Sequence, residues 1–166
     1  MTGLKKMTLI QKKYFTCFIL LIASFIFSGR LHAQTIPARE RICGKWENRE
    51  KTLRLQIRTV NNNYVARVIW FSDTEGKPMS YWKDKRNPDP ALRNRTILGM
   101  SILNGLRYNA AERTWEDGKV YDSKHGKEWN ASAEIDQKGI LKVRGYWHFK
   151  FIGKTMSFHR IRRARP

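Results

Sequence analysis

The sequence predicts an all-β protein, an antiparallel barrel of eight strands with one short helix in the loop around residues 84–95. Short segments in which apolar and polar residues alternate recur along the chain, and such alternation puts one side of a strand in a core and the other in solvent. Turn-forming residues separate these segments, and helical periodicity is almost absent. Closure into a barrel is favoured because an open meander of eight strands would leave two exposed edges.

Residues 1–33 have the features of a secretory signal peptide. A basic start precedes an almost wholly apolar run over residues 14–27, and Ala33 is the small residue that signal peptidase requires. The run is shorter than the ~20 residues that a helix needs to cross a bilayer. We therefore expect cleavage after Ala33, export through the Sec pathway to the periplasm or the medium, and no transmembrane segment in the mature chain.

The strong positive charge belongs to the part of the chain that folds. The formal net charge is +19, and loss of the five basic residues in the signal peptide would leave +14. Such a charge attracts anionic partners, which for an exported protein means components of the cell envelope. Export disfavours specific nucleic-acid binding. Cys17 would leave with the signal peptide, so Cys43 is expected to form no intramolecular disulfide.

The mature chain is expected to divide into a flexible N-terminal arm at residues 34–43, one barrel domain at residues 44–161 and a basic tail at residues 162–166. The first hairpin is the best defined, because Asn61 to Asn63 tolerate positive φ and turn the chain between two strand patterns. The eight expected strands are Gly44–Asn48, Leu53–Arg58, Tyr64–Phe71, Thr96–Leu103, Trp115–Tyr121, Lys127–Ile135, Ile140–Phe149 and Lys154–Ile161.

A dense polar block interrupts the strand pattern between residues 84 and 99. Within it, Asp89 followed by Pro90 predicts the start of one helical turn, because Asp can cap free amide groups and Pro is accommodated at the first helical position. Loops on a rigid barrel often carry binding residues, and carboxylates and paired guanidiniums suit polar ligands. The candidate ligand-binding residues are Asp84, Asn87, Asp89, Arg93 and Arg95. Alternatively, Asp84 and Asn87 cap a tight turn and the arginines form surface salt bridges.

A second polar group surrounds the turn between the fifth and sixth expected strands. Lys119, Tyr121 and Asp122 are candidates for ligand contacts at the same end of the barrel, although a charged hairpin tip is commonly only solvated. Arg144 and Tyr146 share one face of the seventh strand and become ligand contacts if that face points inward. A register shift of one residue exchanges the two faces, so the pattern leaves their direction open.

Gly44 and Trp46 on the first expected strand and Arg160 on the last are candidates for a structural role. First and last strands are neighbours in a closed barrel, so the guanidinium can stack on the indole, an interaction worth ~1 kcal/mol when it is sheltered from water. No metal site is expected, because the histidines lie in separate segments without ligand spacing. The sequence has no nucleophile motif and no phosphate-binding loop, and no cofactor is expected.

A series of short motifs runs from Gly44 to Arg160. In order they are Gly44-x-Trp46, Asp84-x-x-Asn87-Pro88, Arg93-x-Arg95 with Gly99, Trp115-x-x-Gly118-x-x-Tyr121-Asp122, Gly126-Lys127, Leu141-x-Val143-Arg144-Gly145-Tyr146, and Gly153-Lys154-Thr155 with Arg160. This order resembles the domain-of-unknown-function 2147 family of small exported bacterial proteins. The resemblance implies a lipocalin-like (calycin) barrel without established activity, and it adds Pro88 and Gly99 to the structural positions. Trp129 stands where the family tends to have Tyr, which removes any role that needs that hydroxyl.

We expect an exported, noncatalytic binding protein that holds a small amphipathic or hydrophobic ligand in its barrel. The interior is expected to be lined by aromatic side chains, among them Tyr64, Trp70, Trp129 and Trp147. The opposing possibility is that side chains simply fill an eight-stranded barrel. Two alternative functions are an enzyme acting on a cell-envelope component, with Asp84 or Asp89 as acid or base, and a basic protein that binds the envelope through its charge.

Overall fold

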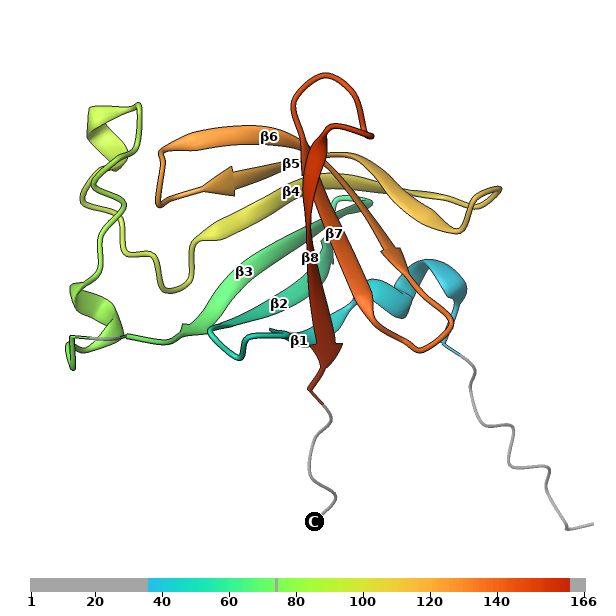
Figure 1. Ribbon diagram of the computed structural model, residues 1–166, viewed down its shortest axis with the longest axis horizontal. Helices are drawn as coiled ribbons and strands as arrows, with labels where there is room; N and C mark the ends of the chain where they lie inside the picture. The colour runs from blue at the N-terminus through green and yellow to red at the C-terminus, as the bar shows by residue number, and fades with distance from the viewer. Residues whose placement is uncertain (1–35, 74, 162–166) are drawn as a thin grey trace, which may run out of the picture. The chain divides into compact units, whose positions relative to one another are not determined.

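The computed structural model describes residues 36–73 and 75–161, so the expected signal peptide at residues 1–33 and the basic tail at residues 162–166 lie outside the described residues. Eight antiparallel strands form a closed barrel in sequential order, and the last strand pairs with the first (Figure 1). The strands are β1 (Gly44–Asn48), β2 (Leu53–Val60), β3 (Asn63–Phe71), β4 (Ser101–Asn109), β5 (Thr114–Asp122), β6 (Lys127–Ile135), β7 (Leu141–Tyr146) and β8 (Gly153–Arg160). This confirms the expected fold class.

The β2–β3 hairpin forms as the sequence predicts. Leu55 and Ile57 of β2 are buried, and Arg54 between β2's inward residues is exposed. Asn61 and Asn62 turn the chain with φ of 48° and 62°, in the left-handed region that Asn tolerates better than other non-glycine residues. The alternating pattern therefore fixes which side of β2 faces the core.

Two strands, β4 and β7, differ from the expectation by more than two residues at one end or both. The strand expected at Thr96–Leu103 is β4 at Ser101–Asn109, because Gly99 takes a φ of +83° and the amide of Met100 donates to the carbonyl of Ile97 in a turn before the strand. The apolar residues before Gly99 therefore belong to the connecting loop, where Ile97 packs against the core. β7 ends at Tyr146 instead of residue 149, since residues 147–152 form the β7–β8 connection.

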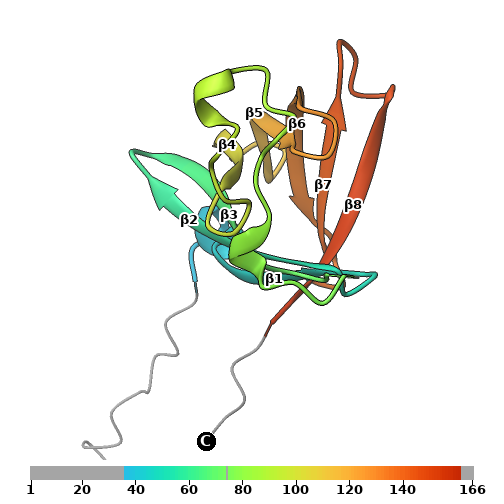
Figure 2. The same cartoon turned by 90° about the vertical axis from the view of Figure 1, so that its left-hand side faces the viewer.

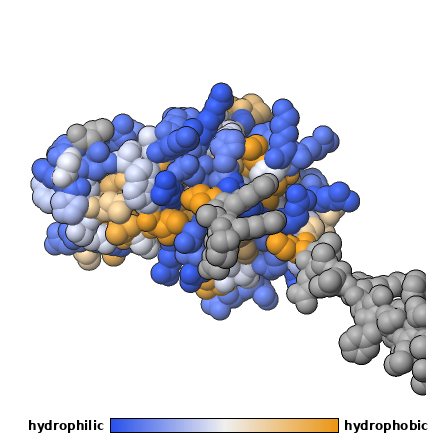
Figure 3. All heavy atoms as spheres, turned by 90° about the horizontal axis from the view of Figure 1, so that it is seen from below, coloured by the Kyte–Doolittle hydropathy of each residue, from blue (hydrophilic) through white to orange (hydrophobic). Residues whose placement is uncertain are grey.

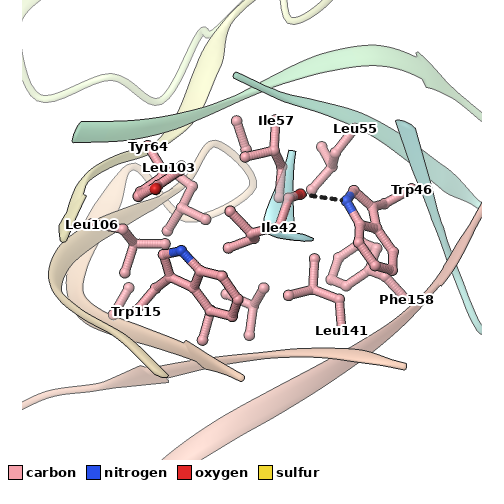
Figure 4. Packing of buried hydrophobic residues seen from close by; sticks show 14 of the residues in the cluster. Ile42, Trp46, Leu55, Ile57, Tyr64, Leu103, Leu106, Trp115, Leu141 and Phe158 are labelled. Atoms are coloured by element: carbon pink, nitrogen blue, oxygen red, sulfur yellow. Dashed lines mark hydrogen bonds between the residues drawn. The ribbon is translucent and has the colours of Figure 1, made fainter. Parts of the chain in front are cut away.

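The N-terminal segment is more ordered than the expected flexible arm. A short 3-10 helix, η1 (Ala38–Ile42), brings Ile42 into the barrel, where it is completely buried. The indole N–H of Trp46 donates to the carbonyl of Ile42 at 2.8 Å (Figure 4), and that of Trp115 donates to the carbonyl of Arg39 at 3.2 Å. Two buried donors are thus satisfied by the helix, which therefore plugs one end of the barrel.

Because successive strands run in opposite directions, successive connections lie at opposite ends of the barrel. The plugged end carries η1 and the turns β2–β3, β4–β5 and β6–β7, because Gly44 pairs with Ile57 near the β2–β3 turn. The other end, called the loop end below, carries the four remaining connections, at residues 49–52, 72–100, 123–126 and 147–152. The long connection between β3 and β4, drawn in green, lies at the ends of these strands in Figures 1 and 2.

Hydrophobic side chains fill the barrel around the plug (Figure 4). Tyr64 belongs to this cluster as expected, and its ring meets that of Trp115 edge to face with centroids 6.2 Å apart. Trp70 is not an interior residue: it pairs across the sheet with exposed Arg54, whose guanidinium lies 4.6 Å above its ring. Trp147 is 57% exposed, because it follows the end of β7. Part of the expected aromatic lining therefore lies outside the barrel.

Candidate functional site

The polar residues singled out in the sequence gather at the loop end. The β3–β4 connection, residues 72–100, holds the polar block of residues 84–99 and two short 3-10 helices, η2 (Met79–Tyr81) before the block and η3 (Pro90–Leu92) within it. The β5–β6 turn holds residues 123–126. The isolated bridge between Lys83 and Thr96 closes the base of this connection. Two segments that are distant in sequence thus meet beside the same barrel opening.

Asp84 is a completely buried carboxylate at the centre of this region. Its Oδ1 accepts from the hydroxyl of Tyr121 on β5 at 2.8 Å. Its Oδ2 accepts from Asn87 at 2.7 Å and from Arg95 at 2.9 Å. A buried charge is tolerated only when it is paired and hydrogen-bonded, as here, so Asp84 ties the β3–β4 connection to the barrel wall.

The surroundings of Asp84 shift two pKa values in opposite directions. Burial alone would raise the pKa of Asp84, but hydrogen bonds from Asn87, Tyr121 and Arg95 outweigh it and lower that pKa below its usual range. Burial and the hydrogen bond to Asp84 raise the pKa of Tyr121 to about 12. Asp84 is therefore ionised and Tyr121 neutral near pH 7.

The other candidates in the block shape the loop. The side chain of Asp89 accepts from the amide of Ala91 at 2.9 Å and caps η3, with Pro90 at its first position, as predicted. Asn87 is buried, and its side chain accepts from the amide of Asp89 across Pro88. Exposed Arg93 donates through Nε to the carbonyl of Asn87 at 2.9 Å. The side chains of Asn87 and Asp89 thus cap the backbone of this loop, whereas the Asp84 carboxylate accepts only from side chains.

The β5–β6 turn packs against the block. Arg86 donates to the carbonyl of Lys124 at 3.1 Å, and Asp122 caps the turn by accepting from the amide of Lys124 at 2.9 Å and contacting His125 at 2.6 Å. Gly126 has a φ of +66°, and a Cβ there would lie 1.9 Å from the carbonyl oxygen of Arg86. Only glycine allows so close an approach, so the turn and the block form one unit.

Lys119, Arg144 and Tyr146 do not join this unit. Lys119 donates to Asn130 of β6 at 2.7 Å. The guanidinium of Arg144 donates to the hydroxyl of Thr155 at 3.2 Å and to backbone carbonyls of the β7–β8 connection, among them that of Phe151 at 2.9 Å. Tyr146 ends β7 and pairs with Gly153. The donors of Arg144 therefore hold a hairpin together.

A basic cleft of about 450 Å³ lies between residues 75–86 of the β3–β4 connection and the β5–β6 turn. The residues that line it are Glu75, Lys77, Tyr81, Trp82, Lys83, Lys85, Arg86, Ile97, Ser123 and Lys124. Lys77 is compensated by Glu75 at 3.2 Å, but no ion pair among the described residues involves Lys83, Lys85 or Lys124. The indole N–H of Trp82 is buried and has no hydrogen-bond partner in the described part of the chain. The cleft therefore offers cations and aromatic surface.

Sequence reasoning missed this basic cleft. Its main signal was the segment Tyr81 to Arg86, in which two aromatic residues are followed by Lys83, Lys85 and Arg86 around Asp84. In the structure, the basic neighbours of Asp84 are the residues available to a ligand, because Asp84 is buried and they are exposed or partly exposed.

The predicted structural residues meet at the plugged end. The guanidinium of Arg160 lies 4.2 Å above the ring of Trp46 and donates to the carbonyl of Cys43 at 2.7 Å. Gly44 has a φ of +135°, and a Cβ there would lie 2.4 Å from the Arg160 guanidinium. This confirms the predicted stacking. Cys43 is partly buried and forms no disulfide with any described residue.

Neither a metal cluster nor a membrane-crossing helix was found within residues 36–73 and 75–161. No group of three or more His, Cys, Asp or Glu side chains there is arranged to hold a metal ion. No helix there has the length and apolar character needed to cross a bilayer.

Comparisons with known proteins agree with this barrel. Among solved structures, the chain is similar to protein HP1028 from the human pathogen Helicobacter pylori, described as belonging to the lipocalin family, with 28% sequence identity and a TM-score of 0.62. The similarity covers 72% of this chain and 82% of that one. No match was found among curated protein sequences. A family model described as an uncharacterized protein conserved in bacteria (DUF2147) matches residues 44–160, and the chain therefore belongs to the DUF2147 family, with a lipocalin-like barrel.

Proposed function

We propose that the chain is an exported, noncatalytic binding protein that holds a small amphipathic anion at the loop end of its barrel. The basic cleft carries this proposal. Lys83, Lys85 and Lys124 suit an anionic head group, whereas Tyr81 and Trp82 suit an apolar tail. Small-molecule sites commonly combine apolar walls with a few polar groups that orient the ligand. The signal-like residues 1–33 support export.

The packing of the barrel favours the cleft over the centre of the barrel as the binding place. Fifteen buried hydrophobic residues form one cluster around the plug, from Ile42 and Trp46 to Phe158. A ligand there would have to displace well-packed side chains, which costs dispersion contacts. A ligand in the cleft would instead contact side chains that already line an open cleft, among them Lys83, Lys85 and Lys124.

The two carboxyl groups considered for catalysis lack the properties of a general acid or base. An acid or base active near neutral pH needs a pKa close to 7 and a proton within reach of substrate. The pKa of Asp84 is lowered, and both of its oxygens accept hydrogen bonds inside the protein. Asp89 is exposed and caps η3. We therefore favour binding over catalysis.

Native mass spectrometry of the protein purified from its own bacterium tests the proposal. We expect a co-purifying small molecule that carries both an anionic group and an apolar chain. The charge-reversed variant Lys85→Glu/Lys124→Glu should lose this molecule, because it turns two of the cleft's cations into anions. With decyl phosphate as a defined probe, titration calorimetry should show at least tenfold weaker binding to this variant.

Arg113→Glu/Lys138→Glu is the matched control with the same change in net charge, since both side chains are exposed on turns at the plugged end. Binding to this variant should remain at the wild-type level. The proposal is wrong if the purified wild type carries no small molecule and does not bind decyl phosphate. It is also wrong if the cleft variant and Arg113→Glu/Lys138→Glu bind equally well.

A further inference from the structure

Exposed hydrophobic side chains gather at the tip of the β7–β8 hairpin. Five of the nine exposed large hydrophobic residues in the described part of the chain lie within ten consecutive positions. Their exposed fractions are Trp147 57%, Phe149 60%, Phe151 76%, Ile152 61% and Met156 39%. The hairpin, in orange and red, projects beyond the neighbouring strands in Figures 1 and 2. Soluble monomers rarely expose such a concentration of apolar groups without a partner.

Several hydrogen bonds and ring contacts hold the tip in a defined conformation. Arg144 donates to carbonyls of the turn, including that of Phe151 at 2.9 Å, and the amide of Ile152 donates to the carbonyl of Phe149 at 3.0 Å. The rings of Phe149 and Phe151 stack with centroids 5.4 Å apart. The ring of Trp147 meets that of Trp129 edge to face at the same centroid distance. These polar contacts use the backbone of the tip, and the rings of Phe149 and Phe151 stay exposed.

Basic residues flank the tip in the sequence. Between residues 143 and 157 the chain has three basic residues, Arg144, Lys150 and Lys154, and no Asp or Glu. Lys150 lies in the tip, where it contacts Glu116, and Lys154 is exposed on β8 just beyond it. An anionic lipid surface attracts each Lys or Arg held near it. By contrast, the lower face in Figure 3 is mostly hydrophilic, with hydrophobic side chains in small groups between polar ones.

We propose that the β7–β8 tip inserts into the head-group region of an anionic bilayer. Trp147, Phe149 and Phe151 would enter the interface, and Lys154 would stay at the level of the lipid phosphates. Aromatic residues next to lysines are the composition of segments that bind membrane interfaces. A protein partner is the poorer fit, because a stable protein interface needs about 800 Å² from each side and a six-residue turn is too small to supply it.

Vesicle flotation tests the proposal with wild type and Phe149→Ser/Phe151→Ser. On vesicles of phosphatidylglycerol and phosphatidylcholine, we expect the double variant to have a partition coefficient at least tenfold lower, because two exposed rings lose their apolar contact with lipid. The matched control is Val60→Ser, since Val60 is 48% exposed at the plugged end. Val60→Ser should partition like the wild type. All three proteins share the same N-terminal residues, so the difference between them reports the tip alone.

A second readout locates the inserted residue. Bromine-labelled phosphatidylglycerol should quench wild-type tryptophan fluorescence, and Trp147→Phe should lose most of this quenching while still binding vesicles. Equal quenching of wild type and Trp147→Phe, or equal partitioning of wild type and the double variant, would overturn the proposal. So would lipid-free self-association that the double variant abolishes in sedimentation experiments, because the tip would then serve contact with a second copy.

Discussion

Replacing Asp84 by Ala should destabilise the protein strongly, because the substitution removes the acceptor for three buried or partly buried donors. Asn87 and Tyr121 would each lose a hydrogen bond, and an unpaired buried donor costs about 1–3 kcal/mol. The Arg95 side chain is 39% exposed, so water replaces much of its contact and we count little for it. The free energy of unfolding should therefore fall by about 3–5 kcal/mol in urea denaturation at pH 7.

Asp89→Ala is the control, because it removes a carboxylate from the same loop. Asp89 is exposed and caps only η3, so its loss should cost about 1 kcal/mol or less. Equal effects of the two substitutions would refute the view that buried Asp84 fastens the loop to the barrel. A far-ultraviolet spectrum like that of the wild type should show that the barrel of Asp84→Ala still forms.

The loss in free energy of unfolding caused by Asp84→Ala should become smaller as pH falls. The folded pKa of Asp84 lies below the ordinary value of 3.8, so ionised Asp84 stabilises the folded state fully above that value. The contribution is lost as pH falls through the folded pKa. Denaturation curves should show a constant difference between wild type and variant from pH 5 to 8 and a smaller one below about pH 4. A difference that grows on acidification would contradict this sign.

Two further substitutions test contacts at opposite ends of the barrel. Tyr121→Phe should lower the free energy of unfolding by about 1–2 kcal/mol, because Asp84 loses a hydrogen-bond donor. In an ultraviolet titration, the variant should lack the tyrosine that ionises at about pH 12. An unchanged alkaline titration would contradict this assignment. Arg160→Leu should cost about 2 kcal/mol, because stacking on Trp46 and the hydrogen bond to the Cys43 carbonyl both disappear. A thermal melt like that of the wild type would show that this contact contributes nothing measurable.

More of the contacts at the plugged end than at the loop end could be predicted from the sequence. Stacking of Arg160 on Trp46 follows once the first and last strands are neighbours, since β1 and β8 pair these two residues directly. The cap at Asp89 follows from the local order Asp-Pro. The plug formed by η1 could not be predicted, because residues 34–43 show no regular pattern, and Ile42 is buried only by the closed barrel around it.

The sequence by itself determined the strands and their closure, because alternation and turn residues act over a few neighbours and each strand must bury one face. The tertiary structure decided the site. Tyr121 reaches Asp84 across 37 positions of the chain, and the basic cleft joins residues 75–86 with residues 123 and 124. Such contacts depend on how a long connection folds back over the barrel. No local pattern encodes that path, so only the folded chain shows which charges are buried and which are left to bind.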